Sequence, residues 1–173
     1  FQNLKSTLVT PKGINLSLEP DVAKHLTLDV LIKKDSLCPR FAAIVVDSVK
    51  VKPSPAYIRS RLEASGIRAI SNVVDISNYL MLEMGQPMHT FDYDKVMGAK
   101  MILTEAQEGE KITTLDGSAR TLPAGSIVIR DAKRLIDLCG IMGGANSRVS
   151  RRTKRVVIFV QAYNPIQIRK TTQ

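Results

Sequence analysis

The sequence predicts an α+β fold, a strand-rich layered domain in which packed sheets carry a few helices. Short runs of β-branched and apolar residues recur along its second half, as the strands of a sheet require. The dipeptide Asp116-Gly117 joins two such runs and is typical of a two-residue hairpin turn. The chain has 173 residues, 44% of them hydrophobic, which is enough for one core and unlike the composition of a disordered segment.

The expected strands follow a simple order along the chain. Proline and glycine interrupt residues 1–27, which are predicted to be a connector from a preceding domain, whereas residues 28–173 are predicted to form the domain itself. Alternating or β-branched runs mark the strand candidates, which span residues 26–32, 41–51, 101–104, 111–114, 119–122, 126–130, 135–139 and 156–160.

Two helices are expected between the first strands and the β-rich half. Ser54 is a good N-cap with Pro55 at the first helical position, and Gly66 is a good stop for that helix. Asp75 is expected to cap a second helix, which Gly85 would end about two and a half turns later.

A last helix is expected to open at Asn164-Pro165 and to run into the C-terminus. The chain also begins with Phe1 instead of a methionine. Both ends are therefore expected to be cut from a longer protein.

Composition excludes several classes of protein. Cys38 and Cys139 are the only cysteines, and His25 and His89 are the only histidines, without any spacing typical of a zinc site. We therefore expect no metal site in this chain. Two isolated thiols fit the reducing cytosol, and no stretch approaches the ~20 apolar residues that span a bilayer, so no membrane partner is expected.

The charge balance has two open interpretations. The 25 Lys and Arg residues exceed the 16 Asp and Glu residues by 25 − 16 = 9 positive charges. This excess favours a polyanion such as RNA, because neutralising phosphates drives binding, but it equally fits a solubilising surface. The densest basic run supplies weak candidates for RNA contact, namely Arg148, Arg151, Arg152, Lys154 and Arg155.

Two features could carry chemistry, and each has a plain structural alternative. The turn Gly140-Ile141-Met142-Gly143-Gly144 lacks the lysine and the following helix of a phosphate loop, which leaves a tight turn or a place where backbone N–H groups hold a carbonyl. His89 follows Pro87 near a predicted helix end. It is either a hydrogen-bonded structural histidine or an imidazole that orients a ligand or handles a proton.

Several motifs of the sequence resemble those of one protein family. The stretch from Ile70 to Asp92 closely resembles the β subunit of bacterial phenylalanyl-tRNA synthetase, in the region of its editing domain. Further motifs follow in the family's order: Cys38-Pro39-Arg40-Phe41, Pro53-Ser54-Pro55, Gly109-Glu110-Lys111, Thr114-Leu115-Asp116-Gly117, Gly140-Ile141-Met142-Gly143-Gly144 and Ile168-Arg169-Lys170-Thr171.

The resemblance implies an editing module that hydrolyses tyrosine mischarged onto phenylalanine tRNA, in a cytoplasmic enzyme that attaches phenylalanine to its tRNA. It implies a synthetase α subunit as partner in an α2β2 assembly, and ATP and magnesium for the intact synthetase but no cofactor in this fragment. Carried over residue by residue, His89, Gly143 and Gly144 would serve catalysis. The substrate would be bound by Ser77, Asn78, Pro87, Cys139 and Gly140.

One position departs from the family pattern. The glutamate that the family associates with the tyrosine hydroxyl falls on Phe159, which can neither donate nor accept that hydrogen bond. Gln161 lies two residues further along the same strand face and could supply the missing polar group. Three hypotheses stay open: an active editing module, a module kept for structure and tRNA contact with weakened proofreading, and a nucleic-acid-binding domain outside any synthetase.

Overall fold

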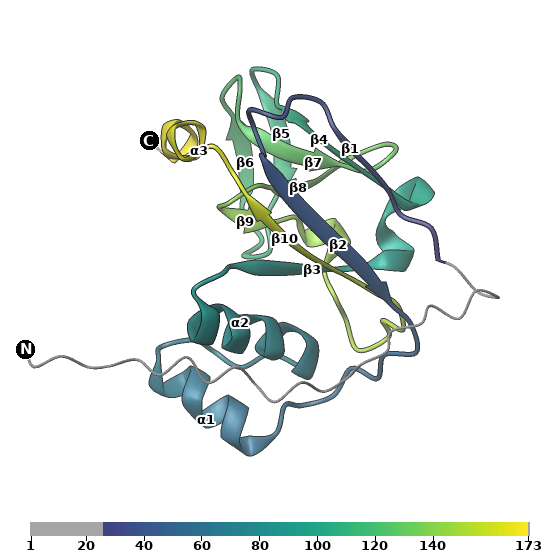
Figure 1. Cartoon of the computed structure of the whole chain (residues 1–173), viewed down its shortest axis with the longest axis vertical. Coiled ribbons are helices and arrows are strands. Elements are labelled where there is room, and N and C mark those ends of the chain that lie inside the picture. The colour runs from purple at the N-terminus through teal and green to yellow at the C-terminus, as the bar shows by residue number, and fades with distance from the viewer. Residues whose placement is uncertain (1–25, 173) are drawn as a thin grey trace, which may run out of the picture.

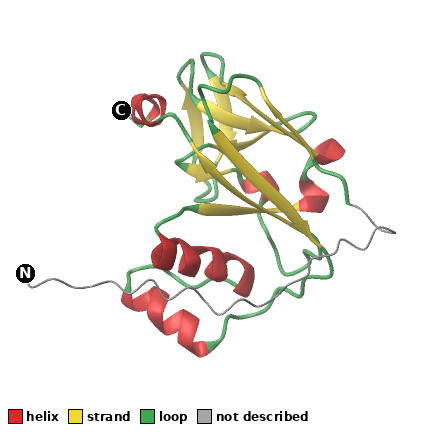
Figure 2. Cartoon of the chain, viewed as in Figure 1, coloured by secondary structure: helices red, strands yellow, loops and turns green. Residues whose placement is uncertain are grey.

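The computed structural model describes residues 26–172, which form three sheets and three α-helices (Figure 1, Figure 2). The predicted α+β class is therefore confirmed. The predicted connector, residues 1–27, lies almost entirely outside the described residues. Among the helices of the described part, none is long and apolar enough to cross a membrane.

The largest sheet has five strands in the order β1-β4-β7-β8-β9. Its strand β1 runs parallel to β4, and the other neighbours are antiparallel. The bounds are β1 Asp29–Ile32, β4 Lys100–Glu105, β7 Ile127–Arg130, β8 Leu135–Leu138 and β9 Met142–Gly143.

The second sheet has three antiparallel strands in the order β2-β10-β3. Strand β10 (Val156–Ala162) lies in the centre, between β2 (Arg40–Val46) and β3 (Met88–Asp92). In this register Phe159 of β10 lies directly opposite His89 of β3. The pairing brings together two residues that lie far apart in the sequence.

The two sheets share one hydrophobic core. Met101, Leu103, Ile129 and Ile136 of the five-stranded sheet pack in one cluster with Phe91, Val157 and Phe159 of the other. The two-stranded sheet of β5 (Glu110–Thr113) and β6 (Ala119–Leu122) packs on the remaining face, where Ile112 and Leu122 join Val128 and Leu138. Strand β7 is thus buried on both faces, because alternate residues point into different clusters. Each fully buried aliphatic side chain contributes about 1.5–3 kcal/mol to folding.

Helices α1 (Ala56–Ala64) and α2 (Asn72–Met84) lie side by side, with α2 directly below β3 in Figure 1. Both predicted N-caps were wrong. Pro55 caps α1 and Ser71 caps α2, whereas Ser54 Oγ donates a hydrogen bond to Asp75 Oδ2 at 2.5 Å. The two residues with the strongest capping chemistry therefore bind each other and join the two helices.

Other local predictions were confirmed or need correction at their bounds. Gly85 ends α2 in the left-handed conformation, at φ 70°, and Asn164 caps α3 (Pro165–Thr171) by accepting from the backbone N–H of Ile166. The hairpin predicted at Asp116-Gly117 joins β5 to β6, but residues 114–118 connect the two strands, so the two-residue turn was wrong. The strand expected over residues 41–51 ends at Val46, and β3 was not predicted at all.

Candidate functional site

A cleft of about 630 Å³ lies where α2, β3, the hairpin loop and residues 148–151 meet. Its lining is mainly apolar, with a few hydroxyl, amide and imidazole groups. The only charged side chains in the lining are those of two arginines. The lining residues are Val51, Ile70, Ser71, Val74, Ser77, Asn78, Met88, His89, Thr90, Leu115, Arg148, Val149, Ser150 and Arg151.

His89 is the titratable group of this cleft apart from the arginines. Its ring meets Phe91 and Phe159 edge-on, with centroids 5.1 and 5.6 Å away. Burial lowers the pKa of His89 to about 4, so the imidazole is neutral at pH 7. Neither ring nitrogen has a hydrogen-bond partner among residues 26–172, so the hydrogen-bonding capacity of the imidazole is unused within the described structure.

The surroundings of Gly143 leave no room for a side chain. A Cβ added there would lie 2.3 Å from His89 Nε2 and 3.2 Å from Leu115 Cδ1. Its φ is not in the left-handed region, so the requirement comes from the close approach of the imidazole and not from backbone strain. A Cβ at Gly144 would meet the carbonyl oxygen of Ile136 at 2.6 Å. The backbone of strand β9 therefore comes within contact of the histidine only because side chains are missing there.

Helix α2 presents two polar residues to the cleft. Ser77 is buried, and its hydroxyl donates to the carbonyl oxygen of Val74 within the same helix at 2.7 Å. The hydroxyl oxygen can still accept a hydrogen bond. Asn78 is half-buried, and its amide forms no hydrogen bond to any described residue. These residues supply an acceptor and a free amide to the cleft.

Several predicted catalytic and substrate-binding residues do not line the cleft. Gly143 and Gly144 are not part of the lining themselves, although Gly143 packs against His89, which is. Pro87 is exposed. Cys139 is fully buried in the core shared by the two sheets, and burial raises the pKa of its thiol well above the usual value. Gly140 adopts a left-handed φ of 69°, and a Cβ there would lie 3.0 Å from Ile168 Cδ1 of α3. Cys139 and Gly140 therefore lie on the core side of the turn, away from the cleft.

The two residues at the departure from the family pattern also lie outside the cleft lining. Phe159 is 1% exposed and packs against Phe41 and Phe91, with ring centroids 5.9 and 4.7 Å away. Gln161 lines a separate cavity of about 720 Å³ beside Arg40 and Phe41. Its Oε1 is buried there without a hydrogen-bond partner in the described structure. Gln161 thus does not take the place of a polar group in the cleft.

The predicted basic run is divided by the fold. Arg148 and Arg151 line the cleft, whereas Arg152 and Lys154 are exposed but are not part of the lining. Arg155 forms an ion pair with Asp94. In addition, its guanidinium lies 5.3 Å from the ring centroid of Tyr93.

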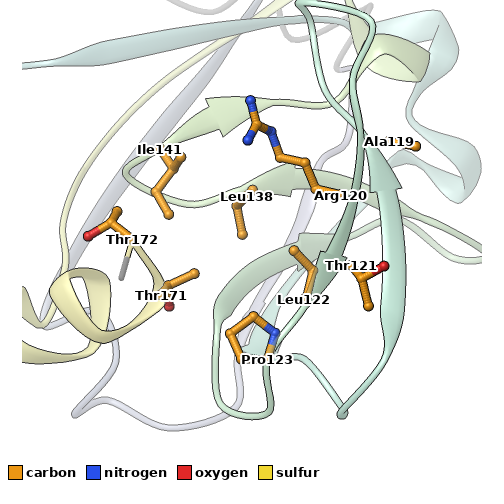
Figure 3. Close-up of a pocket in the computed structure, with 9 residues that line it drawn as sticks. All are labelled: Ala119, Arg120, Thr121, Leu122, Pro123, Leu138, Ile141, Thr171 and Thr172. Atoms are coloured by element: carbon orange, nitrogen blue, oxygen red, sulfur yellow. The ribbon is translucent and has the colours of Figure 1, made fainter.

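A further cavity of about 470 Å³ lies between β6, β8 and the end of α3 (Figure 3). Thr171 and Thr172 lie across it from Leu122 and Pro123, and Arg120 borders it. Arg120 is already paired with Asp116 at 2.8 Å. None of the predicted site residues lines this cavity, so the cleft beside His89 remains the candidate site.

Sequence reasoning missed the apolar part of the cleft. Leu115 reaches it from the hairpin loop, and Val51, Ile70 and Val74 reach it from the segments around the two helices. The signal for Leu115 was its place in the motif Thr114-Leu115-Asp116-Gly117. In residues 26–172 no group of three or more histidine, cysteine or carboxylate side chains could hold a metal ion.

Comparison with known proteins places this arrangement in a family. A family model described as B3/4 domain matches residues 37–173. The phenylalanine–tRNA ligase beta subunit of Protochlamydia amoebophila is 43% identical over 152 residues, which are 88% of this chain and 19% of that protein. The corresponding subunit of Carboxydothermus hydrogenoformans is 45% identical over 146 residues, 84% of this chain and 18% of that protein.

The fold is also found in a solved structure. An N-terminal fragment of the phenylalanyl-tRNA synthetase beta subunit from Pyrococcus horikoshii matches with a TM-score of 0.60 at 15% identity, over 84% of this chain and 46% of that one. The chain spans less than a fifth of the length of the two bacterial relatives. It belongs to the B3/4 domain family, in the form that the beta subunits of phenylalanine–tRNA ligases carry.

Proposed function

We propose that this chain is a hydrolytic editing module that removes tyrosine from mischarged phenylalanine tRNA within a phenylalanine–tRNA ligase. The observation that carries the proposal is the position of His89, which packs against Gly143 and lines a cleft large enough for an amino acid ester. The names of the relatives support the ligase context. In that context the α subunit and phenylalanine tRNA are the partners, and the cytoplasm is the compartment.

Hydrolysis of the ester requires only a few groups from the protein. A water oxygen attacks the ester carbonyl carbon, the bond from that carbon to the ribose oxygen breaks, and the ribose hydroxyl regains a proton. A neutral imidazole has one N–H and one lone pair, so His89 can accept a hydrogen bond from the attacking water. Because its pKa is about 4, it is too weak a base to hold the proton at pH 7. We therefore assign it the orientation of the water, as a positioned reactant lowers the barrier by itself.

The cleft does not fit the aminoacylation reaction. That reaction, in the intact ligase, implies ATP and magnesium, and Mg²⁺ is held by carboxylates and phosphates. The lining of the cleft contains no carboxylate. No step of the proposed hydrolysis involves these groups, and phenylalanine attachment is assigned to another part of the ligase.

The experiment is deacylation of tyrosine-charged phenylalanine tRNA by the intact α/β ligase. His89→Ala should slow deacylation by about 10²-fold, because the attacking water loses the group that orients it. Attachment of phenylalanine by the same enzyme should be nearly unchanged. His89→Asn keeps a hydrogen-bonding group at the position and should lose less. A lowered melting temperature with unchanged deacylation would instead identify His89 as a structural residue.

A second candidate function is favoured by Phe159. This residue closes the aromatic cluster behind His89, where the family pattern has a polar reader of the tyrosine hydroxyl. A hydroxyl buried without a partner costs about 1–3 kcal/mol, which is roughly a tenfold to hundredfold loss of preference for tyrosine. The module would then contribute structure and tRNA contact with weakened proofreading. Equal deacylation rates for tyrosine- and phenylalanine-charged tRNA would favour this second function.

A further inference from the structure

Arg148 and Arg151 stand at one edge of the cleft, in the segment that leads from the short 3₁₀ helix Ala145–Ser147 to β10. Both side chains are exposed. Neither guanidinium forms an ion pair or hydrogen bond with any residue that the structure describes. Four other arginines are each paired with a carboxylate, namely Arg120, Arg130, Arg134 and Arg155. Exposed arginines such as Arg59, Arg68 and Arg152 also lack a partner among the described residues, but only Arg148 and Arg151 line the cleft.

The backbone that carries them is firmly held. The carbonyl oxygen of Arg148 accepts a hydrogen bond from Lys95 Nζ at 2.8 Å. On the other side, Thr153 Oγ1 donates to Asp92 Oδ2 at 2.6 Å and accepts from the backbone N–H of Ser150 at 2.9 Å. Ser147 is fully buried, and its hydroxyl donates to the carbonyl oxygen of Ile136 at 3.0 Å. The two free guanidinium groups therefore project from a segment that is anchored on both sides.

We propose that Arg148 and Arg151 bind the phosphates of the single-stranded RNA end that brings the ester into the cleft. The ligand class follows from the lining: apolar and neutral groups suit an amino acid side chain, while two unpaired guanidiniums suit an anion. Arginine binds phosphate through a planar fork of N–H donors, often by two hydrogen bonds at once. This inference rests on the proposed function, because it is the ester linkage that joins an amino acid to a nucleotide chain.

The arrangement also sets the direction of the ligand. The free ammonium group of an aminoacyl ester is repelled by the two arginines, so the amino acid enters away from them, toward His89 and Asn78. The nucleotide phosphate then lies at the arginine edge. Arginine at these two positions thus orients the ester carbonyl relative to the glycine turn, and it does so through the RNA backbone rather than through a base.

The chain supplies its own matched control. Arg152 and Lys154 are exposed neighbours with the same combined charge, but they do not line the cleft. The double variant Arg148→Ala/Arg151→Ala and the double variant Arg152→Ala/Lys154→Ala remove equal charge from the same short segment. Any difference between them therefore reports position and not net charge.

The test measures binding of uncharged phenylalanine tRNA to the full 173-residue chain over a series of salt concentrations. The cleft pair should weaken binding by about tenfold and make the salt dependence shallower by about one to two counterions, as expected for lost phosphate contacts. The control pair should weaken binding by less than about threefold. With tRNA trimmed of its unpaired 3′ nucleotides, the difference between the two pairs should vanish.

Any other result would contradict the proposal that Arg148 and Arg151 bind the RNA end. Equal weakening by both pairs would show diffuse attraction to a basic surface, and no weakening by the cleft pair would show that its arginines do not touch RNA. A difference that persists with trimmed tRNA would place the contact on the duplex instead of the end. Because this binding needs no hydrolysis, failure of the editing proposal in the His89→Ala experiment would leave the result readable.

Discussion

The turn Gly140–Gly144 separates two regions, the cleft beside His89 and the core between the sheets, and polar side chains are arranged differently in each. On the cleft side, His89 and Asn78 are half-buried and have no hydrogen-bond partner among the described residues. On the core side, Asp137 and Cys139 are 4% and 0% exposed, and Asp137 pairs in register with Gly143 itself. Substitutions on the core side should therefore lower folding stability. Substitutions on the cleft side should mainly change the binding or hydrolysis of a ligand.

The largest expected effect on stability comes from Phe159→Glu, on the core side. The carboxylate would replace a ring that is 1% exposed and lies among Phe41, Phe91 and His89. Burying such a group without partners costs several kcal/mol, so urea unfolding should show a loss above about 3 kcal/mol. Phe159→Leu is the control for lost volume and should cost less. Equal stability of the two variants would show that the new carboxylate reaches the cleft, as the family pattern implies.

The pH dependence of stability compares His89 with Asp137 directly. Burial raises the pKa of Asp137 to about 7, partly offset by a hydrogen bond with Cys139. Between pH 4 and 7 the folded state then holds a proton that the unfolded state has released, so stability falls as pH rises. Burial lowers the pKa of His89 to about 4. Between pH 4 and 6.5 the unfolded state holds the extra proton, so this contribution rises with pH.

Because the two slopes oppose each other, the unmodified chain should show a shallow dependence over this range. His89→Gln removes the rising contribution and should reveal the Asp137 fall, up to about 4 kcal/mol from pH 4 to 7. Asp137→Asn should reveal a smaller rise, because the imidazole is partly solvated. The measurement is urea unfolding at half-unit steps of pH. Slopes of equal sign in both variants would contradict the division between a sealed side and an open side.

Gly143→Ala tests the boundary between the two sides. The added methyl group meets His89 Nε2 at 2.3 Å, so the ring or the turn must move, at a cost of about 1–3 kcal/mol for overpacking. In a His89→Ala background the same change should be largely tolerated, although Leu115 remains 3.2 Å away. A coupling energy above about 1 kcal/mol in the double-mutant cycle is expected. Additive losses would show that the turn resists the methyl group for a reason other than the imidazole.

Local signals in the sequence predicted the structure where a single residue determines the backbone conformation, as glycine does at a turn or a helix end. Asp116-Gly117 predicted the β5-β6 hairpin, and Gly85 predicted the end of α2. The caps at Ser54 and Asp75 failed because their side chains bind each other across the two helices, which no local pattern contains.

The site needed more than local signals. Strand β3 was missed because it is five residues long, follows Pro87 and is defined by its pairing with β10 near the other end of the chain. Residues alone left both His89 and the glycine turn with open alternatives. The resemblance named both, but their contact depends on how the two sheets pack, which spacing in the sequence does not determine.

The smallest expected effect on stability comes from Asn78→Ala, on the cleft side. The Asn78 amide makes no hydrogen bond within the described structure, and its position in the interior of α2 favours alanine by about 0.5–0.7 kcal/mol in helix propensity. Thermal unfolding should therefore show no loss, or a gain of up to about 0.5 kcal/mol. Ser54→Ala is the contrasting variant, because it breaks the hydrogen bond to buried Asp75 and should cost about 1–3 kcal/mol. A loss of stability above about 1 kcal/mol for Asn78→Ala would show that the amide makes a contact that stabilises the fold. An unchanged stability together with slower deacylation would instead assign the amide to binding of the ester that we propose for the cleft.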